Sequence, residues 1–294
     1  MIVPVLMYHH VAPDSGQHTV TVDNFRSQLA FLKEHNIQAL SLAEFNAWRK
    51  GQITLRGPAV LLTFDDAWLD NWVWAIPILQ EFEMPAVFFV ITSWPGEGEP
   101  RWEIRNGGNG WHAPSHESCM ELGGTIGGDS VSMRWSELLA AKDSGLIDIA
   151  SHSHTHGDWW HLKGGWQTML SAASADLKIS LDTLEQKTGS RPTCLCWPKG
   201  LFSRGLSDIA RIQGFDSQFT TLRGGAGSGA EMIQRINVED RPASWLEHRL
   251  RVYSNIVSAS LLALIHQNLH RMRMRKRFPD LPKREFSFPI LRLL

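Results

Sequence analysis

The chain has 294 residues, 43% of them hydrophobic, and a formal net charge of −1 at pH 7. This length and apolar content suit one large domain with a sizeable core. The near-neutral charge argues against nucleic acid or an acidic polymer as partner. The exception is a basic run from Arg271 to Arg277, which we interpret as a solvent-exposed face of the protein. The alternative interpretation is that it makes weak contact with a membrane surface or a biosynthetic complex.

The cysteines and the N-terminus point to a reducing compartment. Cys119, Cys194 and Cys196 form an odd set without C-x-x-C spacing, which predicts reduced, buried thiols. The first residues carry no basic region and no small-residue cleavage site. No apolar run approaches the ~20 residues that span a bilayer. These features predict a cytoplasmic location.

Short apolar runs alternate with helical patterns along most of the chain, which predicts a parallel α/β architecture. The helix near residue 25 is expected to be capped by Asp23 or Asn24. Strands are predicted at residues 3–8, 37–40, 58–64, 85–91, 147–150, 193–197, 215–220 and 233–238. Helices are predicted at residues 25–32, 42–50, 72–82, 135–144, 169–188 and, for the most part, 245–277.

The pattern is lost between residues 93 and 132, a stretch rich in glycine that carries Trp94, Trp102 and Trp111. A long irregular segment inside a compact domain is usually functional or disordered. We interpret it as an insertion that covers the functional site, with a disordered excursion as the alternative. The predicted organisation is a barrel over residues 1–245 that contains this insertion, followed by a helical and basic tail over residues 246–294.

Polar side chains follow two of the predicted strands at the point where each strand ends. Asp65 and Asp66 follow the strand at 58–64, and His152, His154 and His156 follow the strand at 147–150. Carboxylates and neutral imidazoles are the usual ligands of a catalytic divalent metal, which keeps one position open for water. One Asp and two His would form such a site, and the other Asp would be free to act as a base. By alternation His154 should point away from the ligands.

These residues resemble the polysaccharide deacetylases, also called carbohydrate esterase family 4. The first family motif is similar to Thr63-Phe64-Asp65-Asp66, the second to the segment from His152 to His156, and the third to Trp197-Pro198-Lys199-Gly200. The opening Leu6-Met7-Tyr8-His9 looks like that of the subgroup acting on poly-N-acetylglucosamine. Together the motifs cover residues 3–240.

The resemblance implies a distorted (β/α) barrel of seven or eight strands that removes N-acetyl groups from an amino sugar with one divalent metal ion, zinc being the first choice. In family terms Asp65 is the general base. The metal ligands are Asp66, His152 and His156. The turn at Trp197, Pro198 and Lys199 would hold the oxyanion through the backbone N–H near Lys199.

Two departures from the family pattern concern the rest of the site. Lys199 stands where the third motif often has Tyr, which adds a cation. The fifth motif supplies a histidine acid in a Leu-x-His pattern, and Leu264-Ile265-His266 matches it in letters but lies in a predicted helix. His266 is therefore a candidate acid whose role is open. His9 is either a strand-end histidine or a contact to substrate or acetate.

The predicted function is metal-dependent hydrolysis of the N-acetyl group of an N-acetylhexosamine polymer or glycan, with release of acetate. One alternative is a related amide hydrolase that acts on a small cyclic ureide or imide. The other is a catalytically silent sugar-binding barrel, which the presence of all base and ligand residues disfavours. A groove bordered by Trp would favour a polymer, and a lidded pocket a small molecule.

Overall fold

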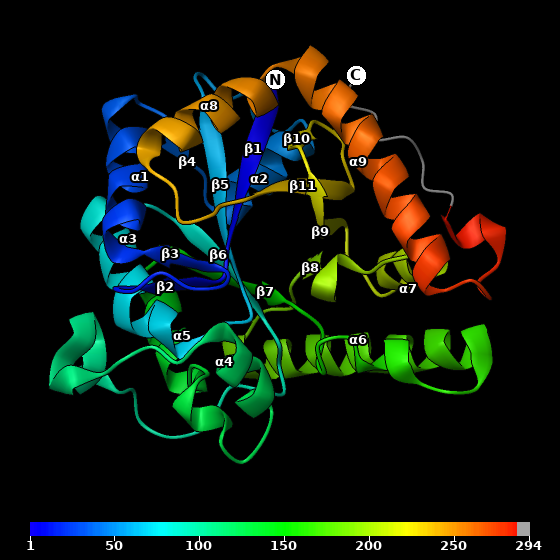
Figure 1. Ribbon diagram of the computed structural model, residues 1–294, viewed down its shortest axis with the longest axis horizontal. Coiled ribbons are helices and arrows are strands. Elements are labelled where there is room, and N and C mark those ends of the chain that lie inside the picture. Colours follow the sequence, from blue (N-terminus) through cyan, green and yellow to red (C-terminus); the bar gives the residue numbers. More distant parts are fainter. Residues whose placement is uncertain (287–294) are drawn as a thin grey trace.

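The computed structural model describes residues 1–286, and its centre is a barrel of parallel strands (Figure 1). Among the described residues, seven strands close the barrel because β1 pairs with both β11 and β5. In order around the barrel they are β1 (Ile2–Tyr8), β5 (Ala59–Asp65), β6 (Ala86–Val90), β7 (Ile147–Ser151), β8 (Cys194–Cys196), β9 (Ser217–Arg223) and β11 (Met232–Asn237). The distorted barrel that the sequence predicted is confirmed, with seven strands.

Four shorter strands lie outside this ring. They are β2 (His10–Ala12) and β3 (Thr19–Thr21), which pair with each other, β4 (Gln38–Ala39), which adds to β5, and β10 (Gly225–Gly227), which runs antiparallel to β1.

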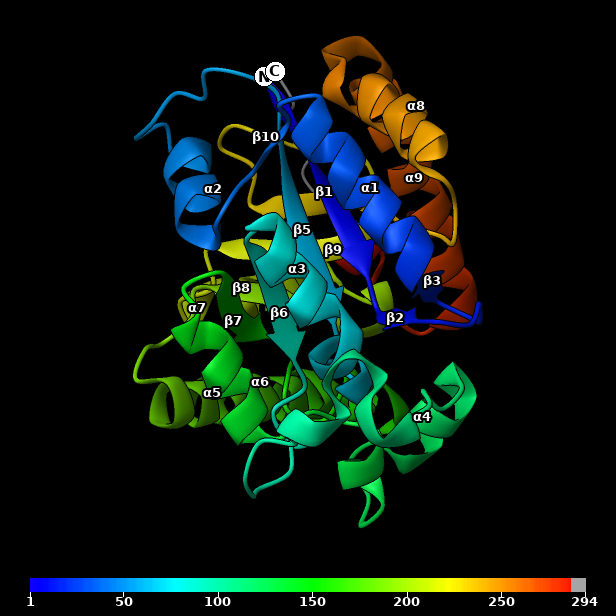
Figure 2. The ribbon, with the colours of Figure 1, turned by 90° about the vertical axis from the view of Figure 1, so that its left-hand side faces the viewer.

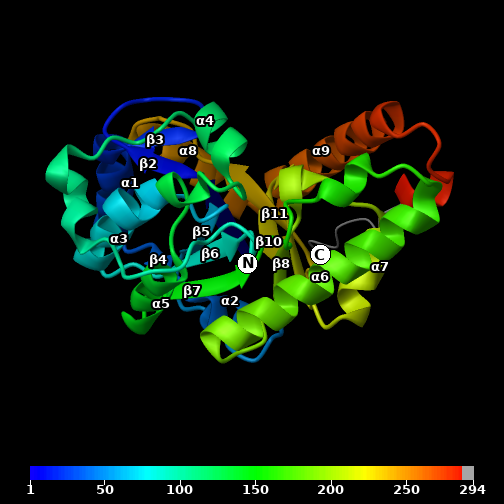
Figure 3. The same cartoon turned by 90° about the horizontal axis from the view of Figure 1, so that it is seen from below.

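Helices surround the strands, with α1 and α3 on one side and α6, α7 and α9 on the other (Figure 3). The helices are α1 (Val22–Glu34), α2 (Leu42–Arg49), α3 (Ile76–Phe82), α4 (His116–Leu122), α5 (Trp135–Asp143), α6 (Gly165–Thr188), α7 (Arg204–Ile212), α8 (Ala243–Ser254) and α9 (Ile256–Arg277). Short helical turns are η1 (Asn71–Ala75), η2 (Trp102–Gly110), η3 (Gly128–Ser130), η4 (Asp158–His161), η5 (Pro198–Gly200) and η6 (Lys283–Phe286).

Two helix boundaries differ from the sequence prediction because side chains cap the helices at other positions. The cap of α1 is Thr21, whose hydroxyl accepts from the backbone N–H of Asn24. Asn255 divides the predicted helix at 245–277 in two, since its side chain accepts from the N–H groups of Val257 and Ser258. Residues 287–294 of the predicted tail lie outside the described residues.

Alternation along β5 decides which side chains enter the barrel. Leu61 belongs to an inner apolar cluster with Val87, Phe89 and Phe219, whereas Leu62 and Phe64 pack outward beneath the helices. Because successive strand residues face opposite sides, Thr63 and Asp65 share the inner face with Leu61. The sequence of β5 thus places the carboxylate of Asp65 inside the carboxyl end of the barrel.

Residues 93–132 are folded, with η2, α4 and η3, and lie at the end toward which the arrows of β1 and β6 point (Figure 2). The end of this insertion is tied to the loop after β5. Leu69 N–H donates to the carbonyl of Val131 over 2.7 Å, and Met133 N–H donates to that of Ala67 over 3.1 Å. Of its tryptophans, Trp102 is 55% exposed, while Trp94 and Trp111 are half-buried.

The C-terminal basic run packs partly against the segment that follows α9. Arg271 Nε donates to the carbonyl of Phe286 over 3.0 Å, and the guanidinium of Arg275 lies over the Phe286 ring. Within residues 1–286, no helix is both long and apolar enough to cross a membrane.

Candidate active site

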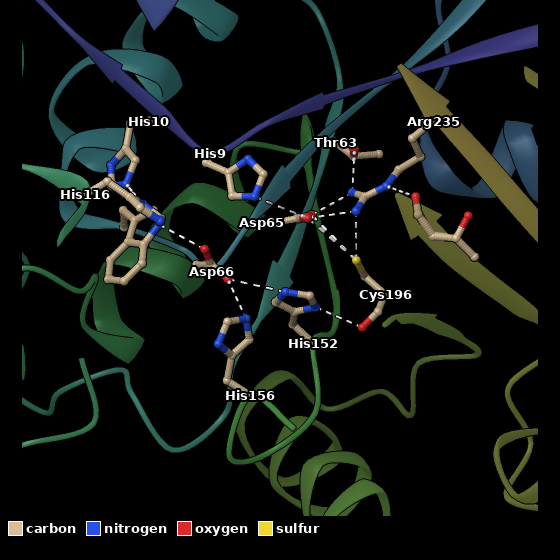
Figure 4. Close-up of polar contacts among 12 residues, drawn as sticks. His9, His10, Thr63, Asp65, Asp66, His116, His152, His156, Cys196 and Arg235 are labelled. Carbon is tan, nitrogen blue, oxygen red and sulfur yellow. Dashed lines mark hydrogen bonds and ion pairs between the residues drawn. The ribbon is translucent and has the colours of Figure 1, made fainter. Parts of the chain in front are cut away.

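The structure brings Asp66, His152 and His156 together at the carboxyl ends of β5 and β7 (Figure 4). Asp66 Oδ1 lies 3.3 Å from His152 Nε2 and 3.6 Å from His156 Nε2, and all three side chains are buried. Asp66 follows β5 with a left-handed φ of 73°, which turns its carboxylate toward the two imidazoles. One oxygen and two nitrogens thus converge on one point.

This group of three fits a divalent cation. Asp66 Oδ1 is buried and accepts no hydrogen bond, and a buried carboxylate oxygen without a partner is costly. Burial works to lower the pKa of His152, but Cys196 and the Asp66 carboxylate outweigh it and raise that pKa well above its ordinary value. At both imidazoles the Asp66 carboxylate is a group that favours positive charge. The ring of His152 is also oriented, because its Nδ1 lies 2.8 Å from the Cys196 carbonyl and Nε2 is left to face Asp66.

Asp176 on α6 fixes the loop that carries the two imidazoles. Its carboxylate accepts from the backbone N–H groups of His154 over 2.7 Å and Thr155 over 3.0 Å. The His154 ring lies elsewhere, with Nδ1 2.9 Å from the hydroxyl of Thr92. Sequence reasoning missed Asp176, because a single acid within a helical stripe gives no signal of what it contacts.

Asp65 forms a buried ion pair with Arg235 of β11. Arg235 Nη1 lies 2.6 Å from Asp65 Oδ1 and Nη2 lies 2.7 Å from Oδ2, so the pair is bidentate. Burial alone would raise the pKa of Asp65, but the Arg235 guanidinium outweighs burial and lowers it. Asp65 is thus held as a carboxylate, and with His152 and Cys196 it forms a second buried group of possible ligand atoms. Arg235 Nη2 also lies 3.1 Å from the thiol sulfur of Cys196.

The sequence analysis missed Arg235, although a signal was present. It lies inside the predicted strand at 233–238, and an arginine that is buried there requires an anionic partner.

Aromatic rings surround Asp66 and His156. Trp68 is buried, and its Nε1–H donates to Asp66 Oδ2 over 3.1 Å, so Asp66 is held on the oxygen that does not face the imidazoles. Trp94 of the insertion lies edge-on to His156, with ring centroids 5.4 Å apart. One of the three insertion tryptophans therefore contacts the site.

Comparison with known proteins agrees with this geometry. A family model described as polysaccharide deacetylase matches residues 52–217, which is more than half of the chain. The chain belongs to the polysaccharide deacetylase family. The matched segment contains Asp65, Asp66, His152, His156 and the turn at Trp197.

The chain is also similar to proteins named poly-beta-1,6-N-acetyl-D-glucosamine N-deacetylase. With that of Escherichia coli (strain K12) it shares 23% identity in an alignment 270 positions long that covers 81% of this chain and 37% of the relative. With that of Staphylococcus epidermidis it shares 26% identity, covering 69% of this chain and 61% of the relative. The chain therefore spans between about a third and three fifths of these relatives' lengths.

Two solved structures share the fold. IcaB from Ammonifex degensii superposes with a TM-score of 0.66 at 24% identity, covering 84% of this chain and 95% of that one. A de-N-acetylase from Aggregatibacter actinomycetemcomitans superposes with a TM-score of 0.69 at 20% identity, covering 85% of this chain and all of that one.

The third family motif forms the tight turn η5. Trp197 is buried, and its Nε1–H donates to Gln218 over 3.0 Å. Lys199 has a left-handed φ of 56° and an exposed side chain. Gly200 is required at its position, because its φ is 64° and a Cβ would lie 1.9 Å from the hydroxyl oxygen of Thr221. Burial lowers the pKa of His156 to about 3, and the positive charge of Lys199 contributes to this shift.

The two remaining histidine candidates occupy different parts of the fold. His9 follows β1, and its Nε2 lies 3.8 Å from Asp65 Oδ2. Its burial lowers its pKa to about 4. His266 is half-buried on α9, and burial together with Arg223 and Arg273 lowers its pKa. Among residues 1–286, no hydrogen bond or ion pair joins His266 to Asp65 or Asp66.

Proposed function

We propose that this protein hydrolyses the N-acetyl groups of a poly-N-acetylhexosamine, releasing acetate and leaving free amines on the polymer. The observation that carries this proposal is the convergence of Asp66, His152 and His156 beside the ionised carboxylate of Asp65. Family membership supports the reaction. The names of the relatives support an N-acetylglucosamine polymer as substrate.

The cofactor we propose is one divalent metal ion held by Asp66, His152 and His156. Two imidazole nitrogens and one carboxylate oxygen suit zinc, which makes zinc the first choice. A cation bound there would polarise the acetamide carbonyl and acidify water.

Asp65 and His9 would move the protons. Asp65 is ionised and can accept a proton from the attacking water, and Arg235 holds it in one orientation. His9 Nε2 lies 3.8 Å from Asp65 Oδ2, so a bridging water would carry this proton to His9, which would pass it to the departing amine, since that group must leave neutral. The number of protons balances, because the proton that the attacking water loses is the one that the departing amine gains. We assign His9 this role ahead of His266 because His9 has a polar contact to Asp65.

Lys199 and its neighbours would border the carbonyl oxygen. The turn at Trp197, Pro198 and Lys199 packs next to the loop of His156, since a Cβ on Gly157 would lie 3.2 Å from the Cβ of Pro198. We propose that backbone N–H groups of this turn stabilise the oxyanion, with the Lys199 ammonium as an added positive charge.

An acetate-release assay tests this function. We expect the purified protein to release acetate from oligomers of β-1,6-linked N-acetylglucosamine, to lose this activity on treatment with a chelator, and to regain it on addition of zinc. A panel with other N-acetylated sugars and a cyclic imide separates the alternatives. Turnover of the imide alone would favour a small-molecule amide hydrolase, and binding of oligomers without any turnover would indicate a silent sugar-binding barrel.

We propose that the insertion forms a wall of the substrate groove, since it lies at the carboxyl ends of the strands and brings Trp94 to His156. Replacing residues 112–126 by a short Gly/Ser linker leaves the ties to Ala67 and Leu69 in place. We expect this variant to lose kcat/KM on long oligomers far more than on a monosaccharide analogue, with the metal retained.

The matched control is Trp102→Ala, because Trp102 is exposed and its ring packs against Trp72. We expect Trp102→Ala to leave kcat/KM unchanged for both the long oligomers and the monosaccharide analogue. An unchanged ratio of kcat/KM between long and short substrates in the linker variant would mean that the insertion serves something other than substrate recognition.

A further inference from the structure

A second hydrogen-bonded chain lies beside the candidate metal site. His10 Nε2 lies 3.0 Å from His116 Nδ1 (Figure 4). On the other side of the His10 ring, Nδ1 lies 2.5 Å from Asp70 Oδ2. Asp70 and His10 are each 2% exposed, whereas His116 is half-buried. The three residues come from the loop before η1, from β2 and from the start of α4. This series of hydrogen bonds thus links the barrel to the insertion.

The chain fixes the hydrogen-bond polarity of His116. The Asp70 carboxylate accepts on both oxygens, from Val11 N–H at Oδ1 and from His10 at Oδ2. If His10 carries a proton on Nδ1 alone, its Nε2 can only accept, and His116 then donates to it through Nδ1–H. The Nε2 atom of His116 is then an unprotonated acceptor. Its state is determined by the Asp70 carboxylate, which acts through His10.

His116 borders a cleft next to the site. The cleft has a volume of about 310 Å³ and is lined mainly by polar side chains, including His10, Asp14, Gln17, His116 and Glu117. A volume near 300 Å³ is at the lower end for small-molecule sites and suits about one sugar ring.

The cleft adjoins the residues assigned to catalysis. The His116 ring lies 6.5 Å from that of His9 and 6.2 Å from that of Trp68, whose Nε1–H holds Asp66. His116 thus separates the cleft from His9, and His116 and Trp68 together separate it from Asp66.

We propose that this cleft binds a neighbouring sugar unit of the polymer, and that His116 Nε2 accepts a hydrogen bond from one of its hydroxyl groups. This rests on the proposed function, because only a chain longer than one sugar reaches the cleft from the metal site. Asp70 and His10 are positioning residues that set His116 as an acceptor. The competing explanation is structural: the chain would merely fasten α4 to the barrel.

The tautomer of His116 can be measured without turnover. In ¹⁵N-labelled protein we expect the imidazole shifts of His116 to report Nδ1–H with an unprotonated Nε2. Asp70→Asn can donate to His10, so it should reverse the chain and give an Nε2–H tautomer at His116. A wild-type His116 already in the Nε2–H form would overturn the proposal.

Binding is the second readout. Titration of a metal-free sample with an oligomer of N-acetylglucosamine should shift the His116 Nε2 resonance, while the monosaccharide should leave it in place. If the His116 Nε2 resonance does not shift at a saturating concentration of oligomer, the cleft is not a sugar-binding subsite. This conclusion would hold whether or not the protein is a deacetylase.

Two substitutions separate the subsite from a fastening role. In His116→Asn the amide can still donate to His10 Nε2, so the hydrogen bond that ties α4 to the barrel is kept. The shorter side chain has no atom where His116 Nε2 was, so the proposed acceptor is removed. We expect KM for oligomers to rise about tenfold, the effect of losing one hydrogen bond, with kcat and the monosaccharide KM nearly unchanged. His116→Gln places an oxygen near Nε2 and should recover part of this loss.

The control is His248→Ala, because His248 is an exposed histidine on α8 that does not line this cleft. It should leave KM within about twofold, well under the effect of one hydrogen bond. If His116→Asn has the wild-type KM for oligomers while acetate release is normal, the proposed function stands and the subsite does not. Absence of acetate release from every substrate would overturn the proposed function, and the resonance titration would still decide on the cleft.

Discussion

The His152→Ala/His156→Ala variant is expected to lose stoichiometric binding of divalent metal and, with it, all measurable acetate release. Both imidazoles face Asp66 Oδ1 within 3.6 Å, so their removal leaves one carboxylate where three ligands converge. A single carboxylate does not hold zinc against water. Metal content per chain after dialysis and acetate release from an N-acetylglucosamine oligomer measure the two effects.

The same variant should also lose the stabilisation that metal gives to the wild type. A ligand that binds only the folded state at 1,000 times its Kd stabilises that state by about 4 kcal/mol. Wild-type protein should therefore show a higher Tm with zinc than without, and the variant should not. His154→Ala is the matched control, since that ring contacts Thr92 and should leave binding unchanged. Full stoichiometric metal in the double variant would end the assignment of these ligands.

The parts of this fold that were predictable are those encoded locally. The strands β1, β5 and β6 are mostly apolar runs, and polar residues lie at the carboxyl ends of β5 and β7, where a parallel barrel gathers its functional groups. Asp66, His152 and His156 could therefore be expected in one place before any contact was known. Their convergence depends on strand order, which the alternation of strands and helices strongly restricts.

The residues that were missed depend on contacts between distant parts of the chain. Arg235 reaches Asp65 across 170 positions, because β11 closes the barrel against β1 and a register shift lies between Ile233 and Arg235. Nothing in the local pattern of β11 specifies that partner. His116 lies in a segment without periodicity, and its position follows from hydrogen bonds that tie the insertion to the loop after β5.

Asp65→Asn is expected to keep its metal and lose nearly all turnover. Asp65 lies close to His152, but both of its oxygens are paired with Arg235, so we expect its replacement to remove a base without removing a ligand. The loss in kcat should be about 10²–10⁴-fold, the usual contribution of a general base. Asp66→Asn is the comparison, because it should lose metal as well as activity. If Asp65→Asn lost the metal and Asp66→Asn kept it, Asp65 would be the ligand and Asp66 the base.

The Asp65→Asn variant also disturbs a buried ion pair, and this effect has to be separated from catalysis. Arg235 is fully buried, and leaving such a charge without its anion costs about 3–5 kcal/mol. Asp65→Asn should therefore lower the free energy of unfolding. Asp65→Asn/Arg235→Met removes both charges and should recover most of this stability while staying inactive. If the double variant recovered turnover together with stability, the lost activity of Asp65→Asn would have come from a damaged fold, and Asp65 would not be the base.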